Sequence, residues 1–223
     1  ISALADLPQV VASDAAHELR TPIAALMVHI DNAVALTPDG EQLLRPLREG
    51  IERLSYLVEQ ILLLNRTVPD AYLAQFTTVD IFDVVKRVVE RDMPQIVLHH
   101  HELDIDGRSI TLQGDAFALE TLVHNLLSNA VKYTPDGGQI RVRFFRDDQH
   151  VVIEVIDSGQ GIPQQERERV FERFYRIGGD QHNSRVMGCG LGLAIAKKIV
   201  DLHRGSVELD SADGTSGLKV IVR

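Results

Sequence analysis

Apolar residues in the first third of the chain recur at alternating spacings of four and three, first over residues 12–33 and again over residues 44–61. This spacing places the apolar side chains on one face of an α-helix. Between the two stretches, Thr37-Pro38-Asp39-Gly40 has the composition of a turn. The pattern therefore predicts a helical hairpin. Its repeating positions are Ala12, Ala16, Leu19, Ile23, Leu26, Ile30 and Ala33 in the first helix and Leu44, Leu47, Ile51, Leu54, Val58 and Ile61 in the second.

The apolar face of the second predicted helix is wide, because Leu43, Leu57 and Leu64 extend it beyond the repeating positions. Two such helices cannot cover each other completely, whereas four can enclose a core. We therefore expect a homodimer built around an all-α, four-helix bundle. The same spacing also fits a plain coiled-coil spacer.

The helical pattern stops around residues 67–72, where Val68-Pro69-Asp70 has the character of a linker. The chain has 223 residues, more than an average single domain, so two domains are expected. We place a helical hairpin domain at residues 1–67 and a second domain at residues 68–223.

The second domain mixes helical and strand patterns. Helices are predicted over residues 81–91, 117–132, 167–175 and 191–202, and strands over residues 98–105, 110–113, 139–145, 151–157, 206–210 and 218–222. Strands with helices clustered between them are typical of an α+β sandwich whose helices cover one face of the sheet.

Composition and charge narrow the function. The formal net charge is −9, which argues against nucleic-acid binding because phosphate contacts need clustered Lys and Arg. The single cysteine, Cys189, allows no internal disulfide and suits a reducing cytoplasm. No stretch approaches the roughly 18 apolar residues that cross a bilayer. Because the sequence starts at Ile1 and not Met, we expect a piece of a longer protein.

The first predicted helix carries a candidate nucleophile, His17. It follows the apolar position Ala16, so it lies on the flank of the predicted bundle, within reach of a donor. A neutral imidazole has a lone pair that can attack a γ-phosphate, and Glu18 can accept the proton of the other ring nitrogen. Pro22 cannot donate to the carbonyl of Glu18, so the helix should bend just beyond this site.

Three Asn- and Gly-rich segments follow in the second domain, at residues 125–130, 157–161 and 188–193. Asn125 and Asn129 are four residues apart on a predicted helix, so their amides point the same way. Asp157 ends an apolar strand, where a carboxylate can accept a hydrogen bond from the amine of adenine. Gly159 and Gly161 after it let the backbone pass close to a base.

The third segment, with Gly188, Gly190 and Gly192, precedes a predicted helix. Its backbone N–H groups and the helix dipole are therefore available to phosphate oxygens. This glycine spacing fits neither the dinucleotide fingerprint nor the P-loop. Histidines 99–101 suggest a metal site, but consecutive residues of a strand alternate faces and cannot all bind one ion.

Taken in order, His17-Glu18-Leu19-Arg20-Thr21-Pro22 and the three later segments resemble the catalytic core of bacterial two-component sensor histidine kinases. The H box surrounds His17, the N box holds Asn125 and Asn129, the first glycine box starts at Asp157, the F box runs over residues 171–174 and the second glycine box starts at Gly188. The resemblance implies a dimerisation and phosphoacceptor domain followed by a Bergerat-type ATP-binding sandwich.

The resemblance also assigns roles to individual residues. It implies Mg²⁺ coordination by Asn125 and Asn129, and a phosphatase role for Thr21. The polar composition of residues 177–186 separately predicts a lid over bound nucleotide, hinged by Phe171 and Phe174. The remaining implied contacts with ATP come from Lys132, Tyr133, Asp157, Gly159, Gly161, Arg173 at the γ-phosphate, Phe174, Arg176, Gly188, Gly190, Leu191 and Gly192.

The expected function is thus ATP-dependent autophosphorylation on His17, transfer of the phosphoryl group to an aspartate of a response regulator receiver domain, and phosphatase activity toward that regulator. The whole protein is expected to be anchored in the inner membrane, with this part in the cytoplasm. One alternative is an ATPase clamp of the gyrase or chaperone type without a phosphoprotein, which the first 65 residues argue against. A dimerising scaffold without kinase activity is a third reading, disfavoured because every box is intact.

Overall fold

The computed structural model describes residues 76–177, 190–212 and 216–223, together with Leu44 and Leu47. The chain divides into two units, Ile1–Thr67 and Val68–Arg223. Leu44 and Leu47 are helical. The other positions of the predicted hairpin, the linker, His17, Glu18, Thr21 and Gly188 lie outside the described residues.

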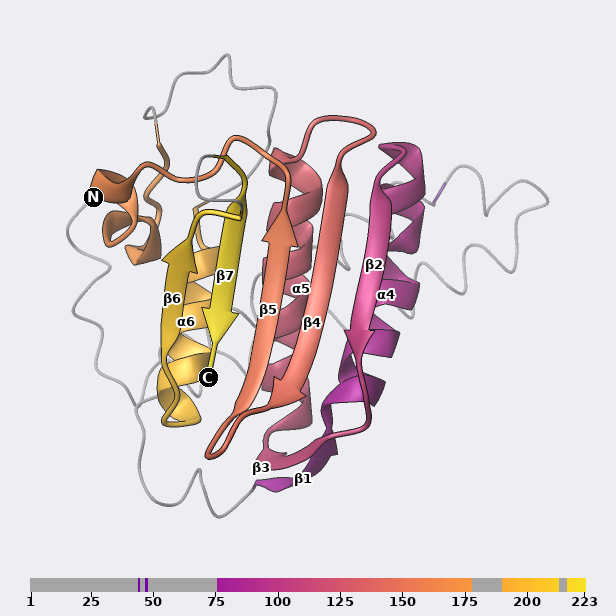
Figure 1. Cartoon of the computed structure of the whole chain (residues 1–223), viewed down its shortest axis with the longest axis vertical. Coiled ribbons are helices and arrows are strands. Elements are labelled where there is room, and N and C mark those ends of the chain that lie inside the picture. The colour runs from indigo at the N-terminus through magenta and orange to yellow at the C-terminus, as the bar shows by residue number, and fades with distance from the viewer. Residues whose placement is uncertain (1–43, 45–46, 48–75, 178–189, 213–215) are drawn as a thin grey trace. The chain divides into compact units, whose positions relative to one another are not determined.

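The centre of the second unit is a five-stranded sheet with the order β2-β4-β5-β7-β6 (Figure 1). Strand β2 pairs in parallel with β4, and the other three pairings are antiparallel. The strands are β2 (Glu102–Gly107), β4 (Gln139–Arg146), β5 (Val151–Asp157), β6 (Val207–Asp210) and β7 (Leu218–Val222).

Three helices cover one face of this sheet: α4 (Ile81–Leu98), α5 (Ala116–Tyr133) and α6 (Gly192–Leu202). Figure 1 shows all three behind the same face, with α5 in the middle. The predicted α+β sandwich with helices on one side is confirmed. No helix in the described part of the chain combines the length and the apolar character needed to cross a membrane.

The alternation of side chains along the strands explains this one-sided arrangement. In β4, Ile140, Val142 and Phe144 are buried under the helices, while Arg141 and Arg143 between them point to the other face. Full burial of one such apolar side chain stabilises the fold by about 1.5–3 kcal/mol. Helices α5 and α6 supply the facing side chains, including the fully buried Leu122, Leu126, Ile195 and Ile199.

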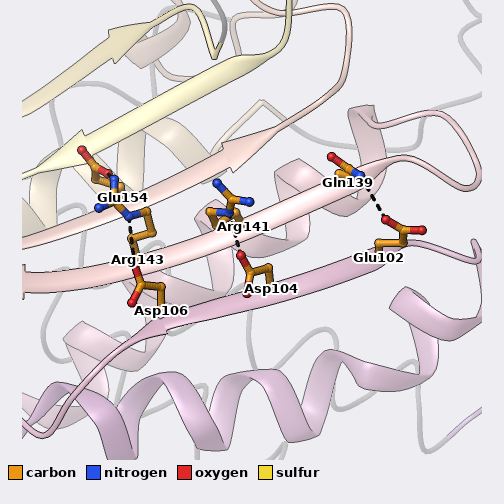
Figure 2. Close-up of polar contacts among 7 residues, drawn as sticks. All are labelled: Glu102, Asp104, Asp106, Gln139, Arg141, Arg143 and Glu154. Carbon is orange, nitrogen blue, oxygen red and sulfur yellow. Dashed lines mark hydrogen bonds and ion pairs between the residues drawn. The ribbon is translucent and has the colours of Figure 1, made fainter.

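The outer face of the sheet carries a ladder of charged and polar pairs between β2, β4 and β5 (Figure 2). Arg141 Nε lies 2.7 Å from Asp104 Oδ2, and Arg143 contacts both Asp106 at 3.3 Å and Glu154 at 3.1 Å. Lys219 Nζ of β7 lies 2.7 Å from the other oxygen of Glu154. The row is completed by Gln139 and Glu102. These pairs give the face a solvated, polar surface.

Side chains cap two of the three helices at their N-termini. The Oδ1 atom of Asp80 accepts the N–H of Phe82 before α4, and that of Asp115 accepts the N–H of Ala118 before α5. In contrast, Leu191 precedes α6 and no side chain caps that helix. The start of α6 is therefore the exception, and it is where the third glycine segment ends.

A second, two-stranded sheet lies at one end of the domain, where β1 (Thr77–Asp80) pairs antiparallel with β3 (Thr111–Gly114). The strand predicted at 110–113 corresponds to β3. Strand β1 was not predicted, because four residues next to a linker carry little periodic signal.

The structure corrects the predicted end of α4. We expected the helix to stop at residue 91 and a strand to begin at 98, but α4 continues through Pro94 to Leu98. The apolar period continues to the buried Ile96, and this burial outweighs the backbone bond lost at Pro94. The helix ends where His100 adopts φ 53°, with the N–H of His101 donating to the carbonyl of Ile96.

The helix predicted over residues 167–175 is wrong. The chain instead makes two single 3₁₀ turns, η2 (Gln164–Glu166) and η3 (Arg169–Phe171), and Phe174 has φ 64°. Tyr175 donates its hydroxyl hydrogen bond to Glu166, and the guanidinium of Arg169 lies over the Tyr175 ring. Contacts of this kind hold the segment in a folded-back shape that an α-helix would not allow.

Candidate nucleotide site

A cavity of about 250 Å³ opens on the helical side of the sheet, between α5, β5 and the segment that follows β5. We call it the base pocket. Its lining is mostly apolar. The lining residues are Leu126, Asn129, Ala130, Tyr133, Val155, Asp157, Gln160, Gly161, Ile162, Val170, Arg176, Ile177, Leu193, Leu218 and Val220.

Asp157 is the one acidic residue in this lining, and it is only 6% exposed. Burial raises the pKa of its carboxyl above the usual value, and the N–H groups of Gly159 and Leu218 partly oppose this by donating to Oδ1 at 2.8 and 3.4 Å. A buried acceptor in an apolar pocket suits a ligand that brings its own hydrogen-bond donor.

The backbone just after Asp157 requires glycine. Gly161 has φ 71°, and a Cβ atom there would lie 2.7 Å from the carbonyl oxygen of Gly217. At Gly159 a Cβ atom would lie 2.5 Å from the carbonyl oxygen of Tyr133. The absence of side chains therefore brings this segment close to both α5 and the start of β7.

The two asparagines face the start of α6. A Cβ atom at Gly192 would lie 3.4 Å from both Asn125 Oδ1 and Asn129 Nδ2. Asn125 is buried, and Asn129 is partly exposed and lines the base pocket. Since no side chain caps α6, this junction offers helix N–H groups and two side-chain amides around one small space.

The other predicted nucleotide contacts are distributed around this junction. Tyr133 and Arg176 line the base pocket. Lys132 and Arg173 are exposed and are not part of its lining. Leu191 is buried, as expected for a residue that anchors the start of α6.

Two residues that flank the predicted lid, Phe174 before it and Gly190 after it, lie next to each other. The N–H of Phe174, whose side chain is 69% exposed, donates to the carbonyl oxygen of Gly190 at 2.9 Å. Residues 178–186 of the predicted lid, and Gly188, lie outside the described residues.

Several pocket residues escaped the sequence analysis. Ile162, Val170, Leu193, Leu218 and Val220 form apolar walls of the base pocket. Their only sequence signal is membership of apolar helix, strand or loop patterns and, for Leu193, of the third glycine segment. Such a pattern predicts burial but does not distinguish a pocket wall from the core.

The premise used for histidines 99–101 is wrong, because they lie in the turn after α4 and not in a strand. The rings of His99 and His101 stack at 5.6 Å, and His101 Nε2 contacts the carbonyl oxygen of Val131. His99 Nδ1 lies 2.9 Å from Asp136, which lowers the pKa of that carboxyl. Within the described residues, no group of three or more His, Cys, Asp or Glu residues is arranged to hold a metal ion.

Comparison with known proteins places both halves of the chain. The family described as "Histidine kinase-, DNA gyrase B-, and HSP90-like ATPase" matches residues 114–223. The family described as "His Kinase A (phospho-acceptor) domain" matches residues 9–68. These matches include the base pocket in the first case and His17 in the second.

Individual relatives agree with the family matches. Sensor protein kinase PmrB of Pseudomonas aeruginosa is 39% identical over 214 residues, covering 94% of this chain and 44% of PmrB. Signal transduction histidine-protein kinase/phosphatase MprB of Mycobacterium ulcerans is 39% identical over 209 residues, covering 89% of this chain and 39% of MprB. A solved structure of a mycobacterial sensor histidine kinase MprB is 34% identical with a TM-score of 0.59, covering 66% of this chain and 95% of that one.

The fold and the base pocket thus define an ATP-binding domain of the class that histidine kinases share with DNA gyrase B and HSP90. The phosphoacceptor match upstream favours a kinase over an ATPase clamp. The chain belongs to the bacterial two-component sensor histidine kinases. It spans less than half the length of the curated relatives named above.

Proposed function

We propose that this chain is the catalytic core of a sensor histidine kinase that phosphorylates His17 from ATP and passes the phosphoryl group to an aspartate of a response regulator. The observation that carries the proposal is the convergence of two subsites. A buried carboxyl, Asp157, lies in an apolar pocket, and the same pocket reaches Asn129 beside the start of α6.

In this proposal Asp157 recognises the base. The exocyclic amine of adenine donates a hydrogen bond to the carboxylate, while guanine presents a carbonyl oxygen at that position, so the pocket selects ATP. Apolar walls such as Val155 and Val220 cover the faces of the base. Tyr133 contacts the adenine or the ribose.

The phosphates lie at the junction of α5 and α6. The uncapped N-terminus of α6 contributes helix N–H groups, and Gly192 leaves room because it lacks a side chain. Asn125 and Asn129 fit Mg²⁺, since amide oxygens are hard donors that suit a cation already carrying phosphate oxygens and water. Bound Mg²⁺ would neutralise phosphate charge there. Lys132, Arg173 and Arg176 add positive charge, with Arg173 at the γ-phosphate.

The acceptor is His17 in the domain that we place at residues 1–67. Its imidazole nitrogen forms a bond to the γ-phosphorus as the bond to the β–γ bridging oxygen breaks and ADP leaves. Glu18 takes the proton from the other ring nitrogen. Thr21 orients a water molecule for hydrolysis of the phosphorylated regulator, and phosphatase activity is included in the printed name of the MprB relative.

We further propose that the chain functions as a homodimer through this domain and that the response regulator docks beside His17. The catalytic domain at residues 68–223 then delivers ATP to the bundle. Because the curated relatives are more than twice as long, the remainder of the protein is proposed to contain the sensor and a membrane anchor, with this part in the cytoplasm.

The direct test is incubation of the purified chain with Mg²⁺ and γ-labelled ATP, beside His17→Ala and Asp157→Asn variants. We expect label on the parent chain that is labile to acid and stable to alkali, as phosphohistidine is, and none on His17→Ala. ATP hydrolysis without protein label, even after rapid quenching, would instead support the ATPase clamp.

A further inference from the structure

One wall of the base pocket is formed by residues 160–162, which belong to neither a helix nor a strand. This wall follows β5 and precedes the 3₁₀ turn η2. Backbone without regular structure lacks a ladder of hydrogen bonds to fix it, so its position depends on individual tethers. The structure provides two of them, both to the β6–β7 end of the sheet.

The first tether uses backbone alone. The N–H of Gly217, one residue before β7, donates to the carbonyl oxygen of Gly159 at 2.9 Å. This bond holds the residue just before the wall, close to Asp157. It leaves Ile162, at the other end of the wall, to be fixed by something else.

The second tether is the side chain of Arg167. Its Nε donates to the carbonyl oxygen of Ile162 at 3.3 Å. Nη1 donates to the carbonyl oxygen of Leu209 at 2.9 Å, and Nη2 donates to Ser211 Oγ at 3.0 Å. One guanidinium therefore joins the end of the pocket wall to the end of β6.

The geometry of this contact favours arginine. The three acceptors lie around one planar group, and a lysine ammonium cannot present donors in that fork. The side chain is about three-quarters buried, and Asp210 Oδ1 lies 3.8 Å from Nη1. Arg167 is not part of the pocket lining, so any effect on a ligand acts through residues that are, beginning with Ile162.

Arg167 also connects to a second part of the pocket through the chain itself. Three residues later, Val170 lines the base pocket from η3. Displacement of Arg167 would thus loosen the apolar contacts of Ile162 and Val170 with one side of a bound base. It would not alter the junction of α5 and α6, which contains Asn125, Asn129 and Gly192.

We infer that Arg167 is a positioning residue that holds Ile162 and Val170 against the base, and so contributes to the preference for adenine over other bases. The inference rests on the proposed function, since it assumes that ATP occupies the base pocket. Substitution of Arg167 is therefore expected to weaken only the part of ATP binding that comes from base recognition, because the phosphate subsite is built from other residues.

The test uses the full chain with Arg167→Gln and Arg167→Lys variants. Binding constants for Mg·ATP and Mg·GTP are measured by calorimetry, and KM for ATP and the rate at saturating ATP are measured for His17 phosphorylation. We expect Arg167→Gln to weaken ATP binding and raise KM by about tenfold, with the saturated rate and GTP affinity within about twofold of the parent. Arg167→Lys should recover part of the loss.

Arg146→Gln is the matched control. Arg146 also donates to a backbone carbonyl, that of Thr111 at 2.7 Å, but it lies outside the base pocket. This variant should change neither nucleotide affinity. If Arg167→Gln does not fold, Ser211→Ala is tested in its place, because it removes one of the three acceptors of the Arg167 guanidinium. It should weaken ATP binding about threefold and leave GTP binding unchanged.

An unchanged ATP affinity in Arg167→Gln overturns the inference, as does an equal loss for ATP and GTP, which would mark a structural role. Failure of the parent chain to bind ATP would overturn the proposed function as well. If the parent chain binds ATP and Arg167→Gln binds it equally well, only the inference about Arg167 is overturned.

Discussion

Two buried carboxylates on strand β5 lie three residues apart and face opposite sides of the sheet. Glu154, on the outer face, contacts both Arg143 and Lys219. Asp157, on the helical face, has backbone N–H donors, and among the described residues no cation pairs with it. Burial of a carboxylate is costly unless the charge is compensated. The charge of Glu154 is therefore compensated within the fold, whereas the carboxyl of Asp157 fits the proposal that a ligand donates a hydrogen bond to it.

This difference shows how one strand separates structure from function. A carboxylate with two cationic partners is satisfied and stabilises the outer face. A carboxyl whose pKa is raised by burial, in a pocket, is typical of a binding or catalytic site. The alternation of strand side chains places the two roles on two faces.

The largest effect is expected from Asp157→Asn. The amide loses the charge-assisted bond and can present an N–H₂ group to the adenine amine, so we expect ATP affinity to fall roughly 100-fold. Calorimetry with Mg·ATP measures this. Affinity close to that of the parent chain would show that Asp157 does not recognise the base.

The same variant should make the ligand-free protein more stable near neutral pH. Because the folded pKa of Asp157 is raised, the folded state binds more protons than the unfolded state, and the carboxyl's contribution to stability falls as pH rises above 3.8. Thermal melts of parent and Asp157→Asn at several pH values should therefore diverge with rising pH. Parallel curves would contradict the raised pKa.

Glu154→Gln should instead lower the stability of the protein and leave its ATP affinity unchanged. It leaves Arg143 and Lys219 without their shared partner, and we expect a loss of about 2 kcal/mol in the free energy of unfolding. ATP affinity should stay the same, because Glu154 is not part of the base pocket. Urea denaturation combined with calorimetry separates the two effects, and a matching loss of ATP affinity would break the division between the two faces.

His203 extends the comparison to a partly buried base. Its Nε2 accepts the N–H of Asp115 at 3.1 Å, Nδ1–H donates to the carbonyl oxygen of Ile199 at 2.8 Å, and Phe76 stacks on the ring. Burial lowers its pKa below 6.5, so the unfolded state binds the proton more readily.

Stability supplied by neutral His203 should therefore be lost as pH falls from 6.5 to the lower folded pKa. Melting temperatures of parent and His203→Gln should converge over this range. We expect a smaller effect than that of Glu154→Gln. A difference in melting temperature between the two proteins that stays constant with pH would contradict the lowered pKa of His203.

The smallest effect is expected from Arg141→Gln. Arg141 and Asp104 are both more than half exposed, so their ion pair is expected to contribute less than about 0.5 kcal/mol. Urea denaturation at low and high salt should show almost no difference from the parent. A loss as large as that of Glu154→Gln would mean that the whole ladder in Figure 2 acts as one network.

Local patterns predicted most of the sheet and its helices. The bounds of β5 and β7 matched the predicted ranges, and α5 differed by one residue at each end. These elements have strong periodicity because one face of each is buried. Prediction failed at α4, where burial of Ile96 overrides Pro94, and at residues 167–175. In that segment, long-range bonds such as those of Arg167 determine two 3₁₀ turns.

In the candidate site, too, local sequence patterns predict some features and long-range contacts determine the others. Asp157, Asn129, Tyr133, Gly161 and Arg176 were named from sequence, and the structure brings all five into the lining of one pocket. Their roles remain predictions. The apolar walls were not found because Leu218 and Val220 reach the pocket from the last strand of the chain. Contacts between such distant segments depend on strand order, which periodicity does not contain.

The bond between the Phe174 N–H and the Gly190 carbonyl has a practical consequence for protein engineering. It joins two parts of the candidate site, because Arg176 and Ile177, just after Phe174, line the base pocket. A fluorescent or affinity tag is therefore better grafted at the exposed turn between β4 and β5, residues 147–150, which lies outside the lining of that pocket.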